Sequence, residues 1–539
     1  MKIIIIGAVA GGTTAATKIR RKDEQAIITM YERDVDISYS GCSLPYFIGD
    51  KITDLNDITP RDVTFFKEKH NIDVFIQHEV LSIDPHEKKV VVKNLQTKEV
   101  FDDFYDSLII STGASVFVPP IQGIDSPHVF FLRTVQDALR IKEYIKYNQV
   151  RHAVIAGSGF IGLEMCENLV DLGIDTKVVE LADSIAGHLD VELSNVLQHR
   201  LEEKGIDIRV SAGISEIHSD SVLLTNGDTI NTQMVIMATG VKPNVSLAKE
   251  AGIKLGETGA IQVNDEMRTS DPFIYSVGDC AETFDLITNK AVYRPLGSTA
   301  NKMGRIVGDV ITGGHLRYRG NLGTSIYKVF DLSVGSTGMT QQDAKDAGYD
   351  VQVVLMTKPN KLAALGGQEM VIKAVADKVT RQLLGVSIVG YEGVDKRLDV
   401  FVTLITLGAK VDELFHLDLA YSPPFSTAKD PVHYVGMVYE SQMEHVISID
   451  KLQSLGKVQL IDARSLDDVN SRGFIEGSTH IPHVEIREKM AQFDKDKMVV
   501  VYCNTGNTSN AVMNILRNNG FKKVTHLMGG HKLYKETSC

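Results

Sequence analysis

Residues 152–180 read HAVIAGSGFIGLEMCENLVDLGIDTKVVE. An apolar stretch leads into Gly157, Gly159 and Gly162, a helical pattern follows, and Glu180 ends a second apolar stretch. This order predicts a strand–turn–helix–strand unit in which the turn and the start of the helix approach a dinucleotide pyrophosphate, and the terminal acid accepts ribose hydroxyls. Because Glu180 would repel a 2′-phosphate, the sequence predicts NADH rather than NADPH.

The amino terminus repeats this arrangement in a less regular form. An apolar run leads into GAVAGG, which contributes Gly7, Gly11 and Gly12, and Val9 stands where the pattern has its middle glycine. Glu32 ends the next predicted strand, about 20 residues further on, as the pattern requires. The acid argues against a plain strand–turn–helix, so we predict a second nucleotide site.

Three further segments extend the pattern, because each follows or contains an apolar strand. They are SLIISTGAS (107–115), MVIMATGVKPN (234–244) and TSDPFIYSVGDCAE (269–282). With the two nucleotide units they resemble the pyridine nucleotide-disulphide oxidoreductases over residues 1–443. The resemblance implies FAD in the first site, with Gly113 and Asp279 among its ligands, and NADH in the second.

The segment SYSGCSLPYFIGD (38–50) carries a single cysteine, Cys42. Glutathione-type disulfide reductases have a Cys-x4-Cys pair there, so the segment resembles the single-cysteine branch of the family. That branch includes coenzyme A-disulfide reductase, NADH peroxidase and water-forming NADH oxidase. The peroxidases and oxidases usually have a histidine in the first glycine loop, and this loop has none. The chain therefore resembles coenzyme A-disulfide reductase and its persulfide-reducing relatives.

A single protein cysteine is enough for disulfide chemistry if the substrate supplies the second sulfur. A Cys42 thiolate can attack a disulfide or persulfide and form a mixed disulfide, with coenzyme A as the second thiol. The attacking form is the thiolate, so we expect an electropositive site around it. The resemblance implies that basic residues meet the coenzyme A phosphates. We assign Arg21, Lys67 and Ser38 to substrate binding, and ordinary solvated charges are the alternative for the two basic residues.

From about residue 320 the pattern predicts an α+β interface domain. The segment DLAYSPPFSTAKDPVHYVG (418–436) resembles the family's interface motif, which implies a homodimer in which Tyr421 donates a hydrogen bond at the partner subunit's Cys42. A packing tyrosine is the alternative. Ala364 and Leu365 stand where coenzyme A-disulfide reductases usually have tyrosines. This favours persulfides over the symmetric coenzyme A disulfide as substrates.

The last 90 residues resemble a rhodanese domain, in which a cysteine carries a sulfane sulfur. Cys503 ends a predicted strand and is followed by a loop and a helix that starts near Ser509. Loop amides and the helix amino terminus would stabilise its thiolate. Thr508 replaces the loop arginine of many rhodaneses, which disfavours thiosulfate as donor. Asp462 and Arg464 match a structural ion pair, and an inactive scaffold is the alternative for the domain.

The remaining cysteines and the bulk composition limit the alternatives. Cys166 and Cys280 are predicted to pack inside the fold, and Cys539 to be a mobile thiol or a resolving cysteine. The five cysteines show neither a metal-ligand spacing nor a disulfide framework, so we expect no metal and a cytoplasmic location. The net charge of -12 disfavours nucleic acid, and no apolar run is long enough for a membrane helix.

These observations predict an α/β protein with two Rossmann-like domains, an α+β dimerisation domain and a C-terminal α/β rhodanese domain. The predicted boundaries are 1–112 with 241–320 for FAD, 113–240 for NAD(P)H, 321–443 for dimerisation and 451–539 for the rhodanese domain. The predicted activity is NADH-dependent reduction of coenzyme A persulfide or related persulfides and polysulfides, with Cys42 and Cys503 as reactive sulfurs. Coenzyme A-disulfide reductase, NADH oxidase and a non-enzymatic sulfur carrier or redox sensor remain the alternatives.

Overall fold

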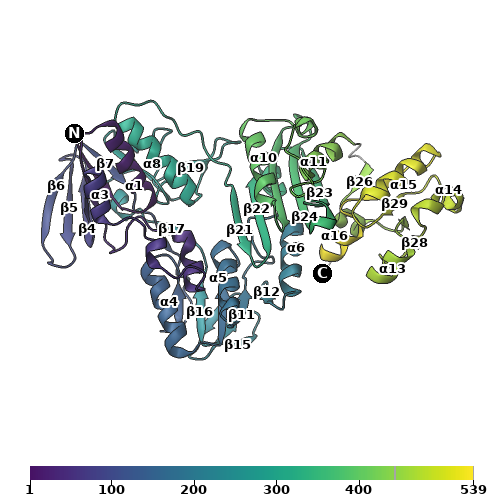
Figure 1. Ribbon diagram of the computed structural model, residues 1–539, viewed down its shortest axis with the longest axis horizontal. Coiled ribbons are helices and arrows are strands. Elements are labelled where there is room, and N and C mark those ends of the chain that lie inside the picture. Colours follow the sequence, from purple (N-terminus) through teal and green to yellow (C-terminus); the bar gives the residue numbers. More distant parts are fainter. Residues whose placement is uncertain (442–444, 538–539) are drawn as a thin grey trace. The chain divides into compact units, whose positions relative to one another are not determined.

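The computed structural model describes residues 1–441 and 445–537. Contacts divide the chain into two compact units, each of which combines helices with sheets (Figure 1). Unit 1 consists of Met1–Asp183 and Asp207–Gly323, and unit 2 consists of Ser184–Ile206 and Thr324–Cys539. The predicted α/β fold class is confirmed. Cys539 lies outside the described residues, so its predicted role stays a prediction.

The first nucleotide fold of unit 1 is a parallel five-stranded sheet in the order β18-β7-β1-β2-β3. Its central strand is almost entirely apolar and buried, as expected for a parallel strand covered on both faces. Helix α1 packs closely on α8, where a Cβ on Gly304 would lie 2.4 Å from the carbonyl oxygen of Gly11. The elements are β1 (Lys2–Ile6), α1 (Ala10–Lys22), β2 (Ile27–Tyr31), α2 (Leu44–Ile48), α3 (Val63–His70), β3 (Asp73–Phe75), β4 (His78–Asp84), β5 (Lys89–Asn94), β6 (Val100–Phe104), β7 (Ser107–Ile110), β18 (Ile274–Ser276) and α8 (Gly297–Ile311).

The second nucleotide fold of unit 1 repeats this design. Its parallel sheet has the order β12-β11-β10-β16-β9, and an antiparallel sheet of β13, β14 and β15 is joined to it in sequence. Strand β17 pairs with β8 where the chain crosses between the two folds. The elements are β8 (Ala114–Val116), β9 (Val129–Phe131), α4 (Val135–Asn148), β10 (His152–Ala156), α5 (Phe160–Asp171), β11 (Asp175–Val179), β12 (Asp207–Arg209), β13 (Ile214–Ile217), β14 (Ser221–Leu224), β15 (Thr229–Asn231), β16 (Met234–Met237) and β17 (Val241–Pro243).

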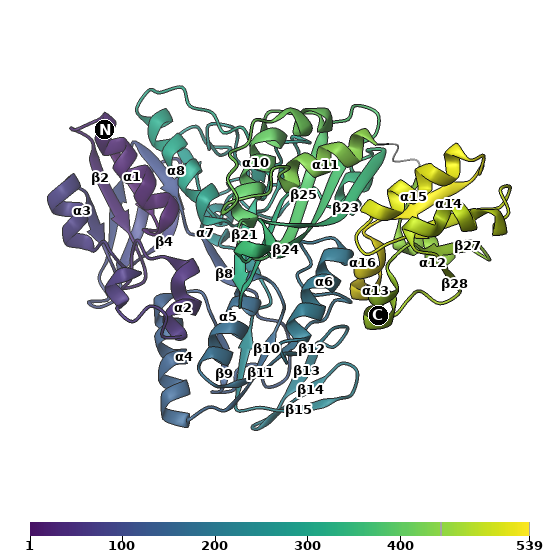
Figure 2. The ribbon, with the colours of Figure 1, turned by 45° about the vertical axis from the view of Figure 1, so that its right-hand side comes forward.

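Unit 2 begins with an antiparallel sheet in the order β21-β22-β25-β24-β23, over which α10 and α11 lie (Figures 1 and 2). Helix α6 comes from the segment between β11 and β12 and is attached here. The buried Lys373 binds Asp190 at 3.1 Å and Glu192 at 2.7 Å at the start of that helix. The elements are α6 (Val191–Glu202), β21 (Ser325–Val329), β22 (Leu332–Gly338), α9 (Gln341–Asp346), β23 (Val351–Pro359), β24 (Glu369–Asp377), β25 (Leu383–Gly390), α10 (Val394–Thr406) and α11 (Pro431–Glu440).

The C-terminal part of unit 2 is a parallel sheet in the order β26-β30-β29-β27-β28. Figure 2 shows helices α12 to α16 gathered around this sheet. The fold therefore has the strand-to-helix connections that the sequence predicts around Cys503. The elements are β26 (Val446–Ile447), α12 (Ile449–Ser454), β27 (Gln459–Asp462), α13 (Leu466–Arg472), β28 (Ser478–His480), α14 (Ile486–Lys489), β29 (Val499–Tyr502), α15 (Asn507–Asn518), β30 (Val524–Leu527) and α16 (Gly530–Thr537).

Short elements complete the described chain: η1 (Gly41–Ser43), η2 (Leu55–Asp57), α7 (Ser246–Glu250), β19 (Thr283–Phe284), β20 (Ala291–Val292), η3 (Ala363–Leu365), η4 (Val411–His416), η6 (His483–Glu485) and η7 (Met490–Gln492). None of the helices described here has the length and apolar character needed to cross a bilayer. Within residues 1–441 and 445–537, no group of three or more His, Cys, Asp or Glu side chains is placed to hold a metal ion.

Candidate active site

The first glycine turn forms a cradle between β1 and α1. Gly7 has φ +101°, and a Cβ there would lie 2.2 Å from the carbonyl oxygen of Ser111, so only glycine fits. The Glu32 carboxylate accepts the backbone N–H of Ala8 at 2.9 Å. Helix α1 begins at Ala10 without a side-chain cap, so its first N–H groups are available to an anion. This donor set fits the pyrophosphate and ribose of a dinucleotide.

The other residues predicted for the first site lie at the same sheet edge. Parallel strands β1, β7 and β18 end side by side, and Gly113 and Asp279 follow two of them. Gly11 lies against the residues that follow β7 and β18, because a Cβ on it would lie 3.0 Å from both Ser111 Oγ and Val277 Cγ2. Asp279 forms an ion pair with Arg133 at 2.6 Å. The sheet therefore gathers these residues where an α/β fold binds its ligand.

The second glycine turn reproduces the first. Gly157 has φ +105°, and a Cβ there would lie 2.5 Å from the carbonyl oxygen of Ala238. A Cβ on Gly162 would lie 2.1 Å from the carbonyl oxygen of Gly157, whereas one on Gly159 would meet nothing within 4 Å. Gly159 thus leaves open space at the start of α5, where a pyrophosphate can approach the backbone.

Glu180 closes this second turn as Glu32 closes the first. Its carboxylate accepts the backbone N–H of Ser158 at 2.9 Å and the hydroxyl of the same residue at 2.7 Å. The backbone N–H of Ala182 donates to the other carboxylate oxygen at 2.9 Å. The carboxylate is therefore held at the carboxyl end of β11, next to the glycine turn.

Cys42 lies in the short turn η1, and its side chain is exposed. Surrounding protein atoms nevertheless desolvate the thiol and raise its pKa. Glu164 raises the pKa further, Arg133 lowers it, and Asp279 raises it. Within the single chain, the charges that act on Cys42 are therefore not the electropositive set that the sequence predicted, because Glu164 and Asp279 oppose Arg133.

Glu164 is a neighbour of Cys42 that was not predicted from the sequence. It lies on α5, and the hydroxyl of Tyr46 donates to it at 3.2 Å. Burial raises the pKa of Glu164 to about 7. The available signal was an acid two residues after Gly162, in the first half of α5. Arg133, also missed, carries no such local signal, because it reaches the site only through the fold.

The residues predicted to bind substrate occupy two places. The backbone N–H of Ser38, a residue with φ 50°, donates to the carbonyl of Ala8 at 2.9 Å, which ties the Cys42 segment to the first glycine turn. Arg21 is exposed at the end of α1. Lys67 is exposed on α3, but it is paired with Asp73 at 2.7 Å. Arg21 is therefore the freer of the two predicted cations.

Arg21 belongs to a basic patch formed by α1 and α3. Burial lowers the pKa of His70, and the charges of Arg21, Lys69 and Arg61 lower it further. These three cations therefore lie close enough to act on one imidazole. Clustered basic side chains of this kind fit phosphate groups. Lys69 was not among the predicted residues.

The interface segment that carries Tyr421 is fixed further along the chain by a buried network. Asp430 accepts hydrogen bonds from Arg397 at 2.9 Å and from Ser426 at 2.6 Å, which fixes the end of the interface segment. Tyr421 itself is 54% exposed and Phe425 72%. Large exposed rings on an anchored segment fit an interface.

Ala364 and Leu365, where tyrosines were expected, lie in η3 of the same domain. The side chain of Leu365 is 47% exposed. Neither residue carries a polar side-chain atom, so neither can donate a hydrogen bond to a substrate sulfur.

Cys503 directly follows β29 and is only 4% exposed. The backbone N–H of Gly506 donates to its Sγ at 3.2 Å, and the Ser509 hydroxyl lies 3.4 Å from the sulfur. Helix α15 begins at Asn507, two residues before the predicted start. The loop thus directs an amide and a helix amino terminus toward the sulfur.

The predicted ion pair of the C-terminal domain and the predicted packing cysteines are both present in the structure. Arg464 and Asp462 form the predicted buried ion pair at 2.5 Å, and Tyr502 donates to the same carboxylate at 2.8 Å. Cys166 and Cys280 are buried, as predicted for packing residues. Cys42 belongs to unit 1, and Tyr421 and Cys503 belong to unit 2.

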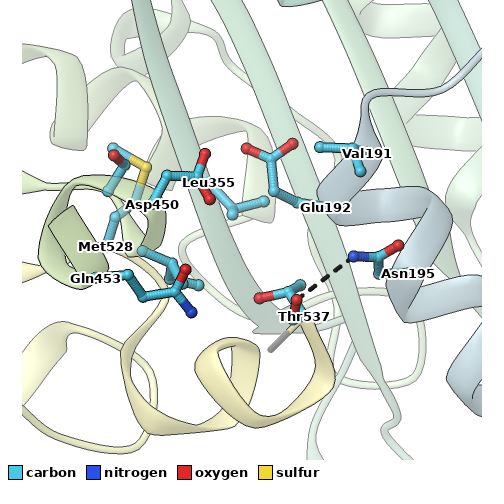
Figure 3. Close-up of a pocket in the computed structure, with 10 residues that line it drawn as sticks. Val191, Glu192, Asn195, Leu355, Asp450, Gln453, Met528 and Thr537 are labelled. Carbon is cyan, nitrogen blue, oxygen red and sulfur yellow. Dashed lines mark hydrogen bonds between the residues drawn. The ribbon is translucent and has the colours of Figure 1, made fainter. Parts of the chain in front are cut away.

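Unit 2 also contains a small cavity of about 90 Å³ (Figure 3). Its lining comes from α6, β23 and the C-terminal domain, and Asn195 donates to the carbonyl of Thr537 at 3.4 Å across it. It contains none of the predicted site residues. The lining residues are Val191, Glu192, Asn195, Leu355, Ser448, Ile449, Asp450, Gln453, Met528 and Thr537.

Comparison with known proteins agrees with these geometries. Residues 1–293 match the family "Pyridine nucleotide-disulphide oxidoreductase", residues 324–431 match its dimerisation domain, and residues 448–537 match the rhodanese-like domain. The chain is 35% identical over 443 residues to the NAD(P)H sulfur oxidoreductase (CoA-dependent) of Pyrococcus furiosus, covering 80% of this chain and 97% of that protein.

Two solved structures are similar over almost the whole chain. The reduced CoADR-RHD of Bacillus anthracis has a TM-score of 0.97 and 36% identity, covering 99% of this chain and 98% of that one. The NAD-dependent persulfide reductase of A. fulgidus has a TM-score of 0.94 and 36% identity, covering 99% and 100%. These matches confirm the resemblance inferred from the glycine turns, the single Cys42 and the Cys503 loop.

Proposed function

Because the chain belongs to the pyridine nucleotide-disulphide oxidoreductase family, we propose that it is an FAD- and NADH-dependent reductase of coenzyme A persulfide or related persulfides and polysulfides. Its products are hydrogen sulfide and a thiol. Family membership implies FAD and NAD(P)H as cofactors, and the dimerisation domain suggests a homodimer. The preference for NADH and the coenzyme A substrate are parts of the proposal.

The observation that carries the proposal is the setting of two cysteines. Cys42 is exposed in a turn of the flavin-type domain, and Cys503 lies in a loop whose Gly506 amide donates to its sulfur. A dithiol pair beside the flavin would indicate disulfide exchange within the protein. One thiol there, combined with a sulfane-sulfur domain, fits a substrate that brings its own second sulfur.

We assign FAD to residues 1–112 with 241–320, and the dinucleotide donor to residues 113–240. When bound, these cofactors supply the electron pair that reduces sulfur at Cys42. Glu180 disfavours a 2′-phosphate by charge repulsion, which supports NADH. The proposed ligands are Gly7, Gly11, Gly12, Glu32, Gly113 and Asp279 for FAD, and Gly157, Gly159, Gly162 and Glu180 for NADH.

The chemistry at Cys42 is a thiol exchange. The Cys42 thiolate attacks the inner sulfur of coenzyme A persulfide, the sulfur–sulfur bond of the substrate breaks, and hydrosulfide leaves. The product is a mixed disulfide between Cys42 and coenzyme A. Two electrons and one proton then cleave it to free coenzyme A and the Cys42 thiolate, so the cycle consumes one NADH for each hydrogen sulfide.

The proposal gives supporting roles in the reaction to residues outside the Cys42 turn. Tyr421, exposed on the dimerisation domain, donates a hydrogen bond at the partner subunit's Cys42. The basic patch with Arg21, together with Ser38 and Lys67, receives the phosphates and the pantetheine arm of coenzyme A. Cys503 takes the outer sulfur from other donors and presents it for reduction.

The test is anaerobic hydrogen sulfide release from NADH and coenzyme A persulfide by wild type, Cys42→Ser and Cys503→Ser. We expect Cys42→Ser to abolish release and Cys503→Ser to slow it only with other sulfur donors. Normal release by Cys42→Ser would contradict the proposal.

The same assay separates the alternatives. Faster turnover with coenzyme A disulfide would indicate a disulfide reductase. NADH consumption that requires oxygen but no sulfur compound would indicate an oxidase. Stoichiometric persulfide formation without turnover would indicate a carrier or sensor.

A further inference from the structure

Lys358 belongs to the dimerisation domain, but its side chain contacts the C-terminal domain. It lies near the end of β23, and its Nζ donates to the side-chain oxygen of Asn507 at 2.9 Å. Asn507 is the first residue of α15, directly after the loop that holds Cys503. A residue of one domain thus reaches the sulfur-binding loop of another.

Lys358 is a buried cation that has no carboxylate partner among residues 1–441 and 445–537. Its side chain is 5% exposed, and the ammonium lies 4.0 Å from the ring centroid of Tyr434. No described carboxylate lies within 4 Å of it. Burial lowers the pKa of Lys358, and a negative charge at Cys503 raises it again. The ammonium and a sulfur anion therefore stabilise each other.

Further contacts hold the two domains together around this pair. Lys532, whose backbone N–H donates to the carbonyl of Asn504 in the Cys503 loop, forms an ion pair with Glu369 at the start of β24. Leu355, on the same strand as Lys358, lines the small cavity with Met528 (Figure 3). The Lys358 contact is therefore one of several between these surfaces.

We propose that Lys358 is a positioning residue for Cys503. The Lys358 ammonium, held at the start of α15, stabilises negative charge on the Cys503 sulfur. It takes the place of the cation that the loop lacks at Thr508. Stabilisation of the thiolate does not depend on the proposed function, whereas stabilisation of a persulfide anion rests on it. The sulfur site is complete only when the C-terminal domain lies on the dimerisation sheet.

The experiment measures alkylation of Cys503 by iodoacetamide at pH 7 in the full-length FAD-loaded protein, followed by mass spectrometry of the Cys503 peptide. Lys358→Met should slow alkylation about 3–10-fold, because the thiolate is the reactive form. Lys358→Arg should restore the rate to within about twofold, since it returns the charge. Lys358→Gln keeps a donor to Asn507 without the charge, and it provides the comparison if Lys358→Met does not fold.

Glu369→Gln is the matched control, because it weakens contact between the same surfaces and leaves Lys358 in place. We expect the wild-type alkylation rate in this variant. An unchanged rate in Lys358→Met and Lys358→Gln, equal slowing in Glu369→Gln, or no rescue by Lys358→Arg would each overturn the proposal.

Alkylation requires no persulfide, so this test is independent of the proposed function. A Lys358 effect without hydrogen sulfide release would retain the positioning role and reject only the reductase. Hydrogen sulfide release without a Lys358 effect would retain the reductase and reject the positioning role.

Discussion

The carboxylate of Glu164 raises the pKa of the Cys42 thiol. Burial raises the pKa of Glu164 to about 7, so the carboxyl group becomes charged near neutral pH. As the pH rises through 7, the new negative charge opposes formation of the Cys42 thiolate. Nucleophile and carboxylate are thus coupled, although they come from different nucleotide folds of unit 1.

Glu164→Gln should therefore make Cys42 more reactive. We expect alkylation of Cys42 at pH 8 to become about 2–5-fold faster, with little change at pH 6, where Glu164 is largely protonated. Rates for the Cys42 peptide between pH 6 and 9 provide the measurement. Asp171→Asn, on the same helix, is the control and should have no effect. A uniform change at all pH values would point to altered access instead.

Glu180→Gln should relax the choice of dinucleotide. Removing the charge should raise kcat/KM for NADPH relative to NADH about tenfold, which corresponds to roughly 1.4 kcal/mol. Steady-state kinetics with both cofactors measures the ratio. Asp175→Asn neutralises a carboxylate at the opposite end of β11 and should leave the ratio as it is. A wild type that already prefers NADPH would refute this reading of Glu180.

Tyr421→Phe should lower kcat about 10–100-fold, because it removes a hydrogen bond to a charged sulfur. If Tyr421 acts on the partner, mixed dimers of Tyr421→Phe with Cys42→Ser contain one complete site. Activity should therefore rise above that of either variant alone when the two are unfolded together and refolded with FAD. No recovery in dimers that have exchanged chains would mean that Tyr421 acts elsewhere.

Asp462→Asn should destabilise the C-terminal domain by about 3–5 kcal/mol, since it leaves Arg464 buried and unpaired. Burial alone would raise the pKa of Asp462, but hydrogen bonds from Arg464 and Tyr502 hold it below the usual value. The pair therefore stabilises the fold above pH about 3.9, and its contribution is lost as the pH falls through the lower folded pKa.

In thermal unfolding of Asp462→Asn, the transition of the C-terminal domain should therefore move to lower temperature than in the wild type. Glu485→Gln, which breaks an exposed pair with Lys489, should cost less than about 1 kcal/mol. Equal shifts in the two variants would contradict the structural role of Asp462.

The sequence predicted those parts of the site that are encoded locally. Gly7 with Glu32 and Gly157 with Glu180 each lie within one strand–turn–helix–strand unit, so spacing alone revealed them. Cys503 was found in the same way, from a strand that ends in a loop before a helix.

The environment of Cys42 could not be predicted in this way. The electropositive surrounding was inferred from what a thiolate needs, whereas the fold brings Glu164 and Asp279 to the thiol from distant segments. Lys358 was missed for a similar reason. A lysine within a strand carries no signal that its ammonium will reach a loop almost 150 residues away.

The hydrogen bond from Ser38 to Ala8 has a consequence for how such a protein can be altered. Only three residues separate Ser38 from Cys42, so the reactive sulfur is held by the same backbone that contacts the first glycine turn. The first glycine turn and the Cys42 segment therefore form one structural unit. A chimera that exchanges the first 35 residues must preserve this contact, or it will carry both parts without their alignment.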